Sequence, residues 1–458
     1  MLGGATMTTA TVVNVSTVIN RGIGRYQLWL FAICFLISLV DGLDSQIMSV
    51  TGPVMARDMQ LPAGALGPLL SASQWGSLVG AFGIGFFADR WGRRQTLLAC
   101  GLVFSIGTLA TAWADSFTAL FALRVITGLG VGGAVPCYLA LAAEYAPENR
   151  RAGVVATILG AVPCGGIVAG LLGASLLGNF NWHVVYLVCG IFSLLVSLLV
   201  YLSLPESLSF MITRKHDPAS IRSVLTKLQP SMSTIPNAKF IIDEEIRQDA
   251  PVKHLFTESR GPLTVVLWLA FFVNYLVLLG TLVWTPTLMK QAGMTIAEGS
   301  LALMFNNIGS ILGIVIAGQI LDRYRSALFW VLASVFLGGA IATSLIGYSA
   351  PHFLAVCFFS AIAGFCMGSG LSGLYALAAI IYPTFMRSTG IGWSSGFGRV
   401  GSSMGPLVVG LMFAASWATP VTLLTLGTGA LANVVLILLM GFLMWRRKSS
   451  ATALASAE

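Results

Sequence analysis

The chain has 458 residues, of which 56% are hydrophobic and only 9% are charged, and its formal net charge is +8. Soluble domains carry about 25% charged residues, so this composition excludes an ordinary water-soluble enzyme and indicates a membrane protein. The positive charge does not indicate a nucleic-acid partner, because the basic residues stand in short clusters between apolar runs. The 7 cysteines form no CxxC pair, so neither a disulfide framework nor a metal site is predicted.

We expect no signal peptide at the start of this sequence. The first 20 residues carry no charge and lack an apolar core, so we expect a short, loose cytoplasmic tail. A membrane span needs about 20 mostly apolar residues. Six such runs begin near Tyr26, Gly64, Thr96, Phe117, Ala152 and Trp182. After a polar stretch, six more begin near Leu263, Ile296, Ala327, His352, Ser388 and Pro420. The sequence therefore predicts an all-α membrane protein with twelve transmembrane helices in two six-helix halves.

The boundaries and the orientation follow from the same pattern. We predict an N-terminal tail at 1–25, a first half at 26–204, a central loop at 205–262, a second half at 263–445 and a C-terminal tail at 446–458. Lys and Arg cluster in the tails, the central loop and alternate short loops, whereas the opposite loops hold only Arg57 and Lys290. Basic loops stay on the cytoplasmic side, which places both termini in the cytoplasm.

The two halves repeat each other in sequence. Residues 85–94 read GFFADRWGRR after the second span, and residues 318–325 read GQILDRYR after the eighth. A second echo pairs residues 145–150 with residues 382–387. Repeated six-helix halves predict a substrate site between them, near the middle of the membrane.

Two motifs carry a resemblance to a known family. The segment GFFADRWGRR resembles the signature G-x-x-x-D-R-x-G-R-R of the major facilitator superfamily, although the second copy has Arg325 where a glycine is expected. Residues 41–44, Asp-Gly-Leu-Asp, resemble the DGxD signature of the aromatic acid:proton symporters within that superfamily. This resemblance implies a bacterial inner-membrane carrier, monomeric and without a cofactor other than the coupling proton, that takes up benzoate, 4-hydroxybenzoate or a related acid.

Four charged residues lie well inside the spans, namely Asp41, Asp44, Arg124 and Arg399. Such residues cost at least about 2.5 kcal/mol each on insertion scales, so they are functional candidates. Asp41 and Asp44 share one helix face, and burial and mutual repulsion both oppose the ionisation of two adjacent carboxyls. We predict that one or both bind the coupling proton. The alternative is that one of them caps backbone at Gly42 or pairs permanently with an arginine.

The two deep arginines have more than one possible role. A guanidinium binds a carboxylate through two parallel hydrogen bonds, which suits an acid substrate. Arg124 is therefore a candidate for substrate binding and equally for pairing with an aspartate of the first span. Arg399 is a candidate for substrate binding or gating, with helix packing as the alternative.

Further candidates are polar groups in apolar spans and charged groups at the cytoplasmic end. Asn274, Tyr275, Asn306 and Tyr375 are predicted to hydrogen-bond the substrate, with ordinary bonding between helices as the alternative. A conformational gate is predicted from Gly85, Asp89, Arg90, Arg93, Glu144, Asp322 and Arg387, with a solvated cluster as the alternative.

These features predict import of an aromatic carboxylate by proton symport with alternating access. A proton-coupled antiporter that exports drugs or metabolites is the alternative. Such antiporters carry glycine directly before the proline of the fifth span, where this chain has Val162 before Pro163. A non-transporting receptor or an enzyme is the third class. The sequence lacks a Walker A loop and an HExxH motif, so neither an ATP-driven pump nor an enzyme is predicted.

Overall fold

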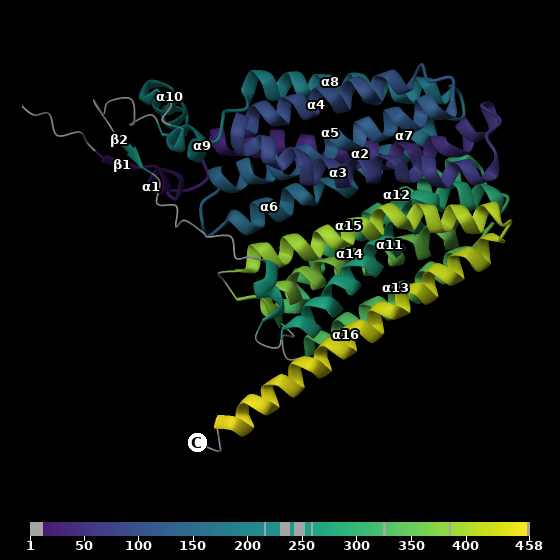
Figure 1. Ribbon diagram of the computed structural model, residues 1–458. Helices are drawn as coiled ribbons and strands as arrows, with labels where there is room; N and C mark the ends of the chain where they lie inside the picture. The colour runs from purple at the N-terminus through teal and green to yellow at the C-terminus, as the bar shows by residue number, and fades with distance from the viewer. Residues whose placement is uncertain are drawn as a thin grey trace, which may run out of the picture.

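The computed structural model describes residues 12–214, 217–229, 239–241, 252–257, 260–323, 327–383 and 386–455. The N-terminal half contains α2 (Arg25–Asp58), α3 (Leu66–Trp91), α4 (Arg93–Thr111), α5 (Phe117–Tyr145), α6 (Arg151–Leu159) continued by α7 (Ala161–Leu176), and α8 (Trp182–Ser203). The C-terminal half contains α11 (Gly261–Gln291), α12 (Ile296–Arg323), α13 (Leu328–Ser349), α14 (Phe353–Ile381), α15 (Arg387–Ala414) and α16 (Thr419–Ala455). The predicted fold, two halves of six long helices each, is confirmed (Figure 1).

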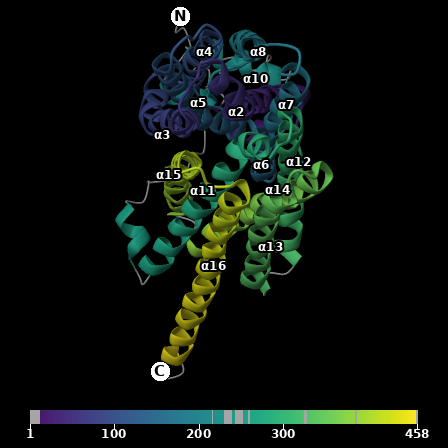
Figure 2. The same ribbon diagram turned by 90° about the vertical axis from the view of Figure 1, so that its right-hand side faces the viewer.

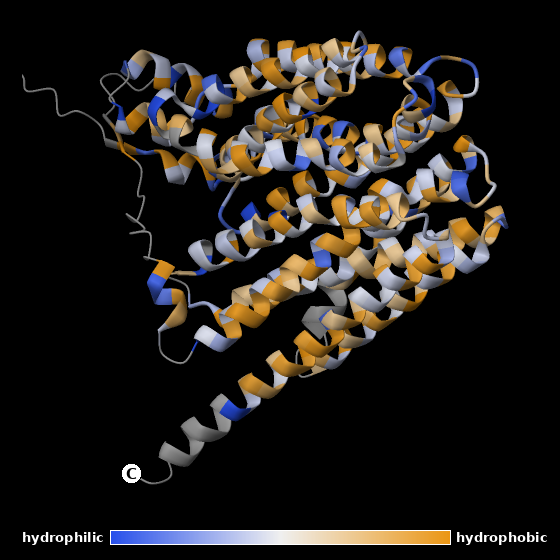
Figure 3. Ribbon diagram, turned by 45° about the vertical axis from the view of Figure 1, so that its right-hand side comes forward, coloured by the Kyte–Doolittle hydropathy of each residue, from blue (hydrophilic) through white to orange (hydrophobic). Residues whose placement is uncertain are grey.

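The helices have the composition of membrane spans. Within the described residues, 10 segments are long and apolar enough to cross a bilayer, and α3 and α4 complete the set. Large apolar side chains stand on the outside of the bundles, for example Leu354, Leu411 and Trp330 at 80%, 72% and 70% exposure. Hydrophobic residues occur along the length of the helices in both halves (Figure 3). Exposing such apolar surfaces to water is unfavourable in free energy, whereas exposing them to lipid is not. These faces therefore lie against the bilayer.

The two halves lie side by side, as the two views show (Figures 1 and 2). We call the end of the bundle where the central loop leaves α8 the loop end, and the opposite end the far end. The halves meet where α7 packs on α12, α3 on α15 and α2 on α11. Toward the far end a Cβ on Gly410 would lie 2.5 Å from the Cα of Gly67, so only glycine permits this approach of α15 to α3.

Residues 12–19, within the predicted loose tail, form regular structure, so the expectation of a loose tail was wrong for these residues, whereas residues 1–11 lie outside the described residues. Strand β1 (Val12–Asn14) pairs in parallel with β2 (Lys239–Ile241) of the central loop, and α1 (Val15–Ile19) follows directly. The central loop also forms α9 (Leu208–Thr213), α10 (Pro218–Leu228) and the 3-10 helix η3 (Val252–Phe256). The cause is apolar burial, because Val15 and Val18 belong to one buried cluster with Leu225 of α10.

Candidate functional site

Helix α2 carries both predicted aspartates, and two glycines set its position. A Cβ on Gly42 would lie 1.9 Å from the carbonyl oxygen of Val162, and a Cβ on Gly165 would lie 2.1 Å from that of Leu39. Backbone therefore meets backbone where α2 crosses α7, a contact that small residues permit in membrane helices. This is the physical reason for glycine between Asp41 and Asp44, and it fixes the directions in which the two carboxylates leave the helix.

We expect Gly42→Ala to prevent correct packing of α2 on α7. Overpacking a core usually costs about 1–3 kcal/mol, and here the obstructing atom is backbone, which cannot rotate away. The measurement is the yield of monodisperse carrier after membrane extraction, which should fall several-fold. Gly153→Ala in α6 is the matched control, because a Cβ there meets nothing within 4 Å. Equal yields of the two variants would show that the crossing is not tight.

Asp44 forms a buried ion pair with Arg124 of α5. Arg124 Nη1 donates to Asp44 Oδ1 at 3.0 Å, and the two side chains are 3% and 1% exposed. Thr108 Oγ1 of α4 donates to the same carboxylate oxygen at 3.0 Å, and Arg124 Nη2 donates to Thr111 Oγ1 at 2.8 Å. The ring of Tyr186 lies under the guanidinium carbon at 5.1 Å. The geometry thus brings Arg124 to an aspartate of the first span, and all its partners named here belong to the N-terminal half.

Asp41 has a different environment, although it lies one helical turn away. It is partly exposed, and its contact among the described residues is Ser45, whose Oγ donates to the Asp41 carbonyl at 2.8 Å and to Oδ1 at 3.3 Å. The charged groups whose fields act on this carboxylate are Arg399 of α15 and Asp44. Arg399 Nη1 also donates to Ser77 Oγ of α3 at 3.3 Å. A carboxylate of one half and a guanidinium of the other therefore act on each other across the interface.

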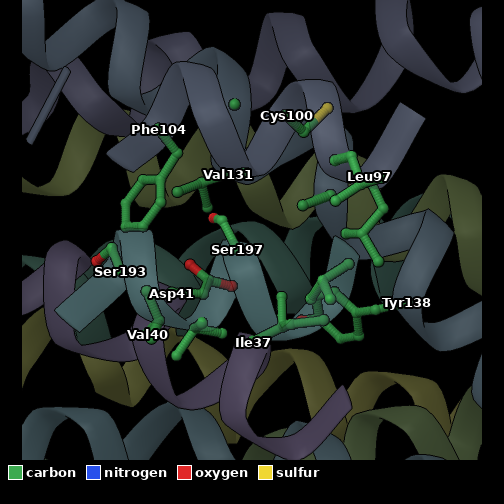
Figure 4. Close-up of a pocket in the computed structure, with 16 residues that line it drawn as sticks. Ile37, Val40, Asp41, Leu97, Cys100, Phe104, Val131, Tyr138, Ser193 and Ser197 are labelled. Carbon is green, nitrogen blue, oxygen red and sulfur yellow. The ribbon is translucent and has the colours of Figure 1, made fainter. Parts of the chain in front are cut away.

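Asp41 also borders a cavity inside the N-terminal half (Figure 4). Side chains of α2, α4, α5 and α8 line this cavity. On one side, Tyr138 donates its hydroxyl hydrogen to Ser38 Oγ at 3.5 Å. Asp41 thus faces two spaces, the interface with Arg399 and this cavity.

The predicted polar residues of the C-terminal half form two groups. Tyr275 and Tyr375 approach each other, with 3.5 Å between their hydroxyl oxygens. Asn274 and Asn306 are buried, and the side-chain oxygen of each lacks a hydrogen-bond partner among the described residues. A buried polar atom without a hydrogen-bond partner carries a desolvation penalty in free energy. A ligand that donates a hydrogen bond to either oxygen would remove this penalty, so both oxygens are candidates for ligand binding.

The neighbouring Asn307 makes a contact that the sequence did not predict. Its Nδ2 donates to Gln46 Oε1 at 2.7 Å, and Gln46 Nε2 donates to Asn307 Oδ1 at 3.2 Å. This reciprocal amide pair joins α2 to α12 and therefore one half to the other. Gln46 lies on the far-end side of Asp41, so the pair helps to close the halves at that level.

A cluster at the loop end connects several predicted gate residues. The guanidinium of Arg93 bonds to the carboxylate of Glu144, which also accepts from Ser207 Oγ. The carboxylate of Glu206 accepts from the backbone N–H groups of Arg93 and Arg94 at 2.9 and 3.0 Å. These groups begin α4, where a helix N-terminus favours negative charge. Glu206 and Ser207 escaped the sequence analysis, although an acid just beyond the sixth span was a visible signal.

The structure gives little information on the remaining predicted gate residues. The side chains of Gly85, Asp89 and Asp322 lie outside the described residues. Arg90 and Arg387 are exposed at the loop end. Their proposed roles in gating remain predictions.

We expect Glu206→Ala to destabilise the N-terminal half. Hydrogen bonds to a charged group contribute about 1.5–3 kcal/mol, and this carboxylate accepts two from the start of α4. The melting temperature of the purified carrier should fall, whereas Glu148→Ala, also at the loop end, should leave it nearly unchanged. An unchanged melting temperature for Glu206→Ala would show that the cap contributes nothing.

Comparison with known proteins provides an independent result. The family model described as Major Facilitator Superfamily matches residues 34–345 and 267–458. The gallate transporter of Pseudomonas putida is 34% identical over 95% of this chain and 96% of its own length. The 4-hydroxybenzoate transporter PcaK of Pseudomonas aeruginosa is 29% identical over 93% and 96%. The benzoate transport protein of Acinetobacter baylyi is 29% identical over 88% and 87%. These matches confirm the resemblance that the motifs predicted.

Solved structures agree on the fold. The chain superposes on the xylose transporter XylE from E. coli, in a partially occluded inward-open conformation, with a TM-score of 0.69, 16% identity and coverage of 92% and 98% of the two chains. At this identity the likeness shows the architecture alone. Both comparisons match transport proteins, so the prediction that the chain is not an enzyme is confirmed.

Proposed function

Because the chain belongs to the major facilitator superfamily, we propose that it imports a small aromatic carboxylate together with a proton by alternating access. The observation that carries this proposal is the placement of two membrane-depth charges, Asp41 in one half and Arg399 in the other, which form no ion pair among the described residues but are near enough for their charges to interact across the interface. The names of the relatives support the substrate class, since they are transporters of gallate, 4-hydroxybenzoate and benzoate.

The different surroundings of the two aspartates support an assignment of the proton to Asp41. Asp44 accepts hydrogen bonds from Arg124 and Thr108, and loss of its charge would leave a buried guanidinium without a counterion. Among the described residues, the side chain of Asp41 takes part in one hydrogen bond, which it accepts from Ser45 Oγ, and its backbone carbonyl accepts a second one from the same hydroxyl. Its proton can therefore come and go without breaking a buried ion pair.

The coupling follows from competition for Arg399. An ionised Asp41 attracts this guanidinium, whereas a protonated Asp41 leaves it free to bind the carboxylate of a substrate in a bidentate pair. Substrate binding then requires proton binding. Asn274, Asn306 and the hydroxyls of Tyr275 and Tyr375 are the candidates to bind groups on the aromatic ring.

One proton and one carboxylate together carry no net charge. Import should therefore respond to the pH gradient and not to the membrane potential. For one proton per substrate, the largest accumulation is about tenfold per pH unit, because each tenfold ratio corresponds to about 1.4 kcal/mol.

The experiment is uptake of labelled 4-hydroxybenzoate into vesicles, with a panel of unlabelled aromatic acids as competitors and with or without a protonophore. We expect accumulation that the protonophore abolishes and that the acids inhibit to different extents. Accumulation that survives the protonophore would refute symport. Depletion of the label by an inward proton gradient would instead support the exporting antiporter.

We further propose the orientation of the carrier. The basic loops support a cytoplasmic location for both termini and the loop end, in the inner membrane of a bacterium. The halves meet at the far end, through the Gln46–Asn307 pair and the approach of Gly67 to Gly410. With the far end outside, these contacts argue against an outward-open state.

A further inference from the structure

The cavity beside Asp41 lies entirely within the N-terminal half (Figure 4). Its walls come from α2, α4, α5 and α8, and none of the described residues of the C-terminal half lines it. It is therefore separate from the interface between the halves, where Arg399 stands. We propose that this cavity binds a small lipophilic amine as its ammonium ion, and that occupancy blocks protonation of Asp41. The block of transport rests on the function proposed above, whereas the binding does not.

The side chains that line the cavity indicate that the non-charged part of the ligand is apolar. Most lining side chains are apolar, among them Ile37, Val40 and Leu97. The rings of Phe104 and Tyr138 stand on opposite sides of Asp41 (Figure 4). An apolar or aromatic body gains free energy by leaving water for such a site, and a polar body does not.

The charge of the residues that line the cavity indicates that the head group of the ligand is cationic. Within the part of the chain that the structure describes, Asp41 is the one carboxylate that lines the cavity, and no Lys, Arg or His does so. An anion is therefore repelled, whereas an ammonium ion can pair with Asp41 and lie near the two rings. An ammonium carries three N–H donors.

Two hydroxyls of α8 can accept the remaining donors. Ser193 Oγ donates to the Cys189 carbonyl at 2.7 Å, and Ser197 Oγ lies 3.1 Å from Ser105 Oγ. Each oxygen keeps a lone pair for a further bond. The cavity thus offers a carboxylate and hydroxyl acceptors to a cationic donor.

Binding of the ammonium and of the proton to Asp41 exclude each other. The groups that face this carboxylate are Arg399 of α15, Asp44 of α2, Tyr138 of α5 and Cys100 of α4, while α8 contributes only serine hydroxyls. Tyrosine and cysteine ordinarily titrate above pH 8. Protonation of Asp41, proposed above as the coupling step, removes the counterion of the ammonium. The affinity for the amine should therefore weaken as the pH falls through the range in which Asp41 takes up its proton, by at most about tenfold per unit for one proton.

The test is binding to purified carrier in detergent, measured by calorimetry and by thermal shift. The probe is 2-phenylethylamine, and 2-phenylethanol is the neutral control of the same shape. We expect the amine to bind at least tenfold more tightly than the alcohol and to raise the melting temperature more at pH 7.5 than at pH 5.5. Equal binding of the two probes, or binding that strengthens at low pH, would overturn the proposal.

Variants locate the site. Ser193→Leu fills the cavity from α8 and Val131→Phe fills it from α5, and either should weaken amine binding at least tenfold. Ser193→Ala leaves the space open but removes one hydroxyl acceptor, so it should weaken amine binding less than Ser193→Leu does. Leu198→Phe, on the exposed face of the same helix, is the matched control and should bind the amine as the unchanged protein does. If a folded filling variant retains full affinity, the amine does not occupy this cavity.

The transport readout separates this proposal from the proposed function. The amine should inhibit proton-driven uptake of 4-hydroxybenzoate, and Ser193→Leu should relieve the inhibition. If the amine binds but uptake is not proton-driven, the symport proposal fails and the site stands. If uptake is proton-driven but the amine does not bind, the site fails and the symport proposal stands.

Discussion

Asp41→Asn is expected to abolish accumulation of substrate against its gradient while leaving exchange intact. Asparagine resembles the protonated aspartate in shape and charge, so Arg399 remains free to bind the substrate carboxylate. Without a titrating group the cycle no longer consumes a proton. Accumulation at a gradient of one pH unit should fall from a limit of about tenfold to equality with the outside. Counterflow exchange of labelled for unlabelled acid should remain.

The control is Asp58→Asn, because Asp58 lies on the same helix at its exposed end beside Arg57. This variant should accumulate substrate normally. Undiminished proton-driven accumulation by Asp41→Asn would remove Asp41 from the coupling. Loss of exchange as well, in a folded variant, would place Asp41 in substrate binding rather than in proton transfer.

Asp44→Asn is expected to act on stability rather than on coupling alone. The substitution leaves Arg124, which is 1% exposed, without its counterion. Breaking one partner of a buried pair typically costs about 3–5 kcal/mol, which suffices to unfold a marginally stable membrane domain. The melting temperature of the purified variant should fall steeply, and more than for Asp41→Asn.

The double variant Asp44→Asn with Arg124→Gln separates a structural role from a chemical one. Removing both charges should restore much of the lost stability, because no unpaired charge then remains buried. If Asp44→Asn alone is as stable as the unchanged protein, the pair does not support the fold. If the stable double variant also retains full proton-driven accumulation, Asp44 takes no part in coupling.

The sequence predicted the twelve helices well, because unbroken apolar runs and basic loops are strong signals in a membrane protein. It did not reveal which aspartate is paired. Asp41 and Asp44 share a face in any helix, and the difference arises from Arg124, 80 residues away on α5. Partners at such separation depend on how α2, α4 and α5 pack.

Threonines and amides illustrate the same limit. Thr108 and Thr111 look like ordinary residues of an apolar helix, and Thr111 indeed also donates to the Gly107 carbonyl within α4. Only the fold turns them toward Asp44 and Arg124. Asn306 and Asn307 are adjacent, yet a helix points them about 100° apart, and only Asn307 reaches Gln46.

The terminal strand was missed for another reason. Val12–Asn14 has three residues, too few for a periodic pattern, and its partner strand lies more than two hundred residues further along the chain. The strand is stabilised by burial of neighbouring valines against α10, a contact between distant segments that a local sequence pattern does not reveal.

The confinement of the Asp44–Arg124 pair to one half bears on turnover. Under the proposed alternating access, this pair moves together with the rest of the N-terminal half, so the energy barrier includes no cost for separating two buried charges. The contacts that open at the far end include an amide pair, and such bonds between membrane helices are worth only about 1 kcal/mol. In the proposed cycle, protonation of Asp41 removes its attraction to Arg399 across the interface. Proton binding to Asp41 can therefore determine when the two halves are free to move relative to each other.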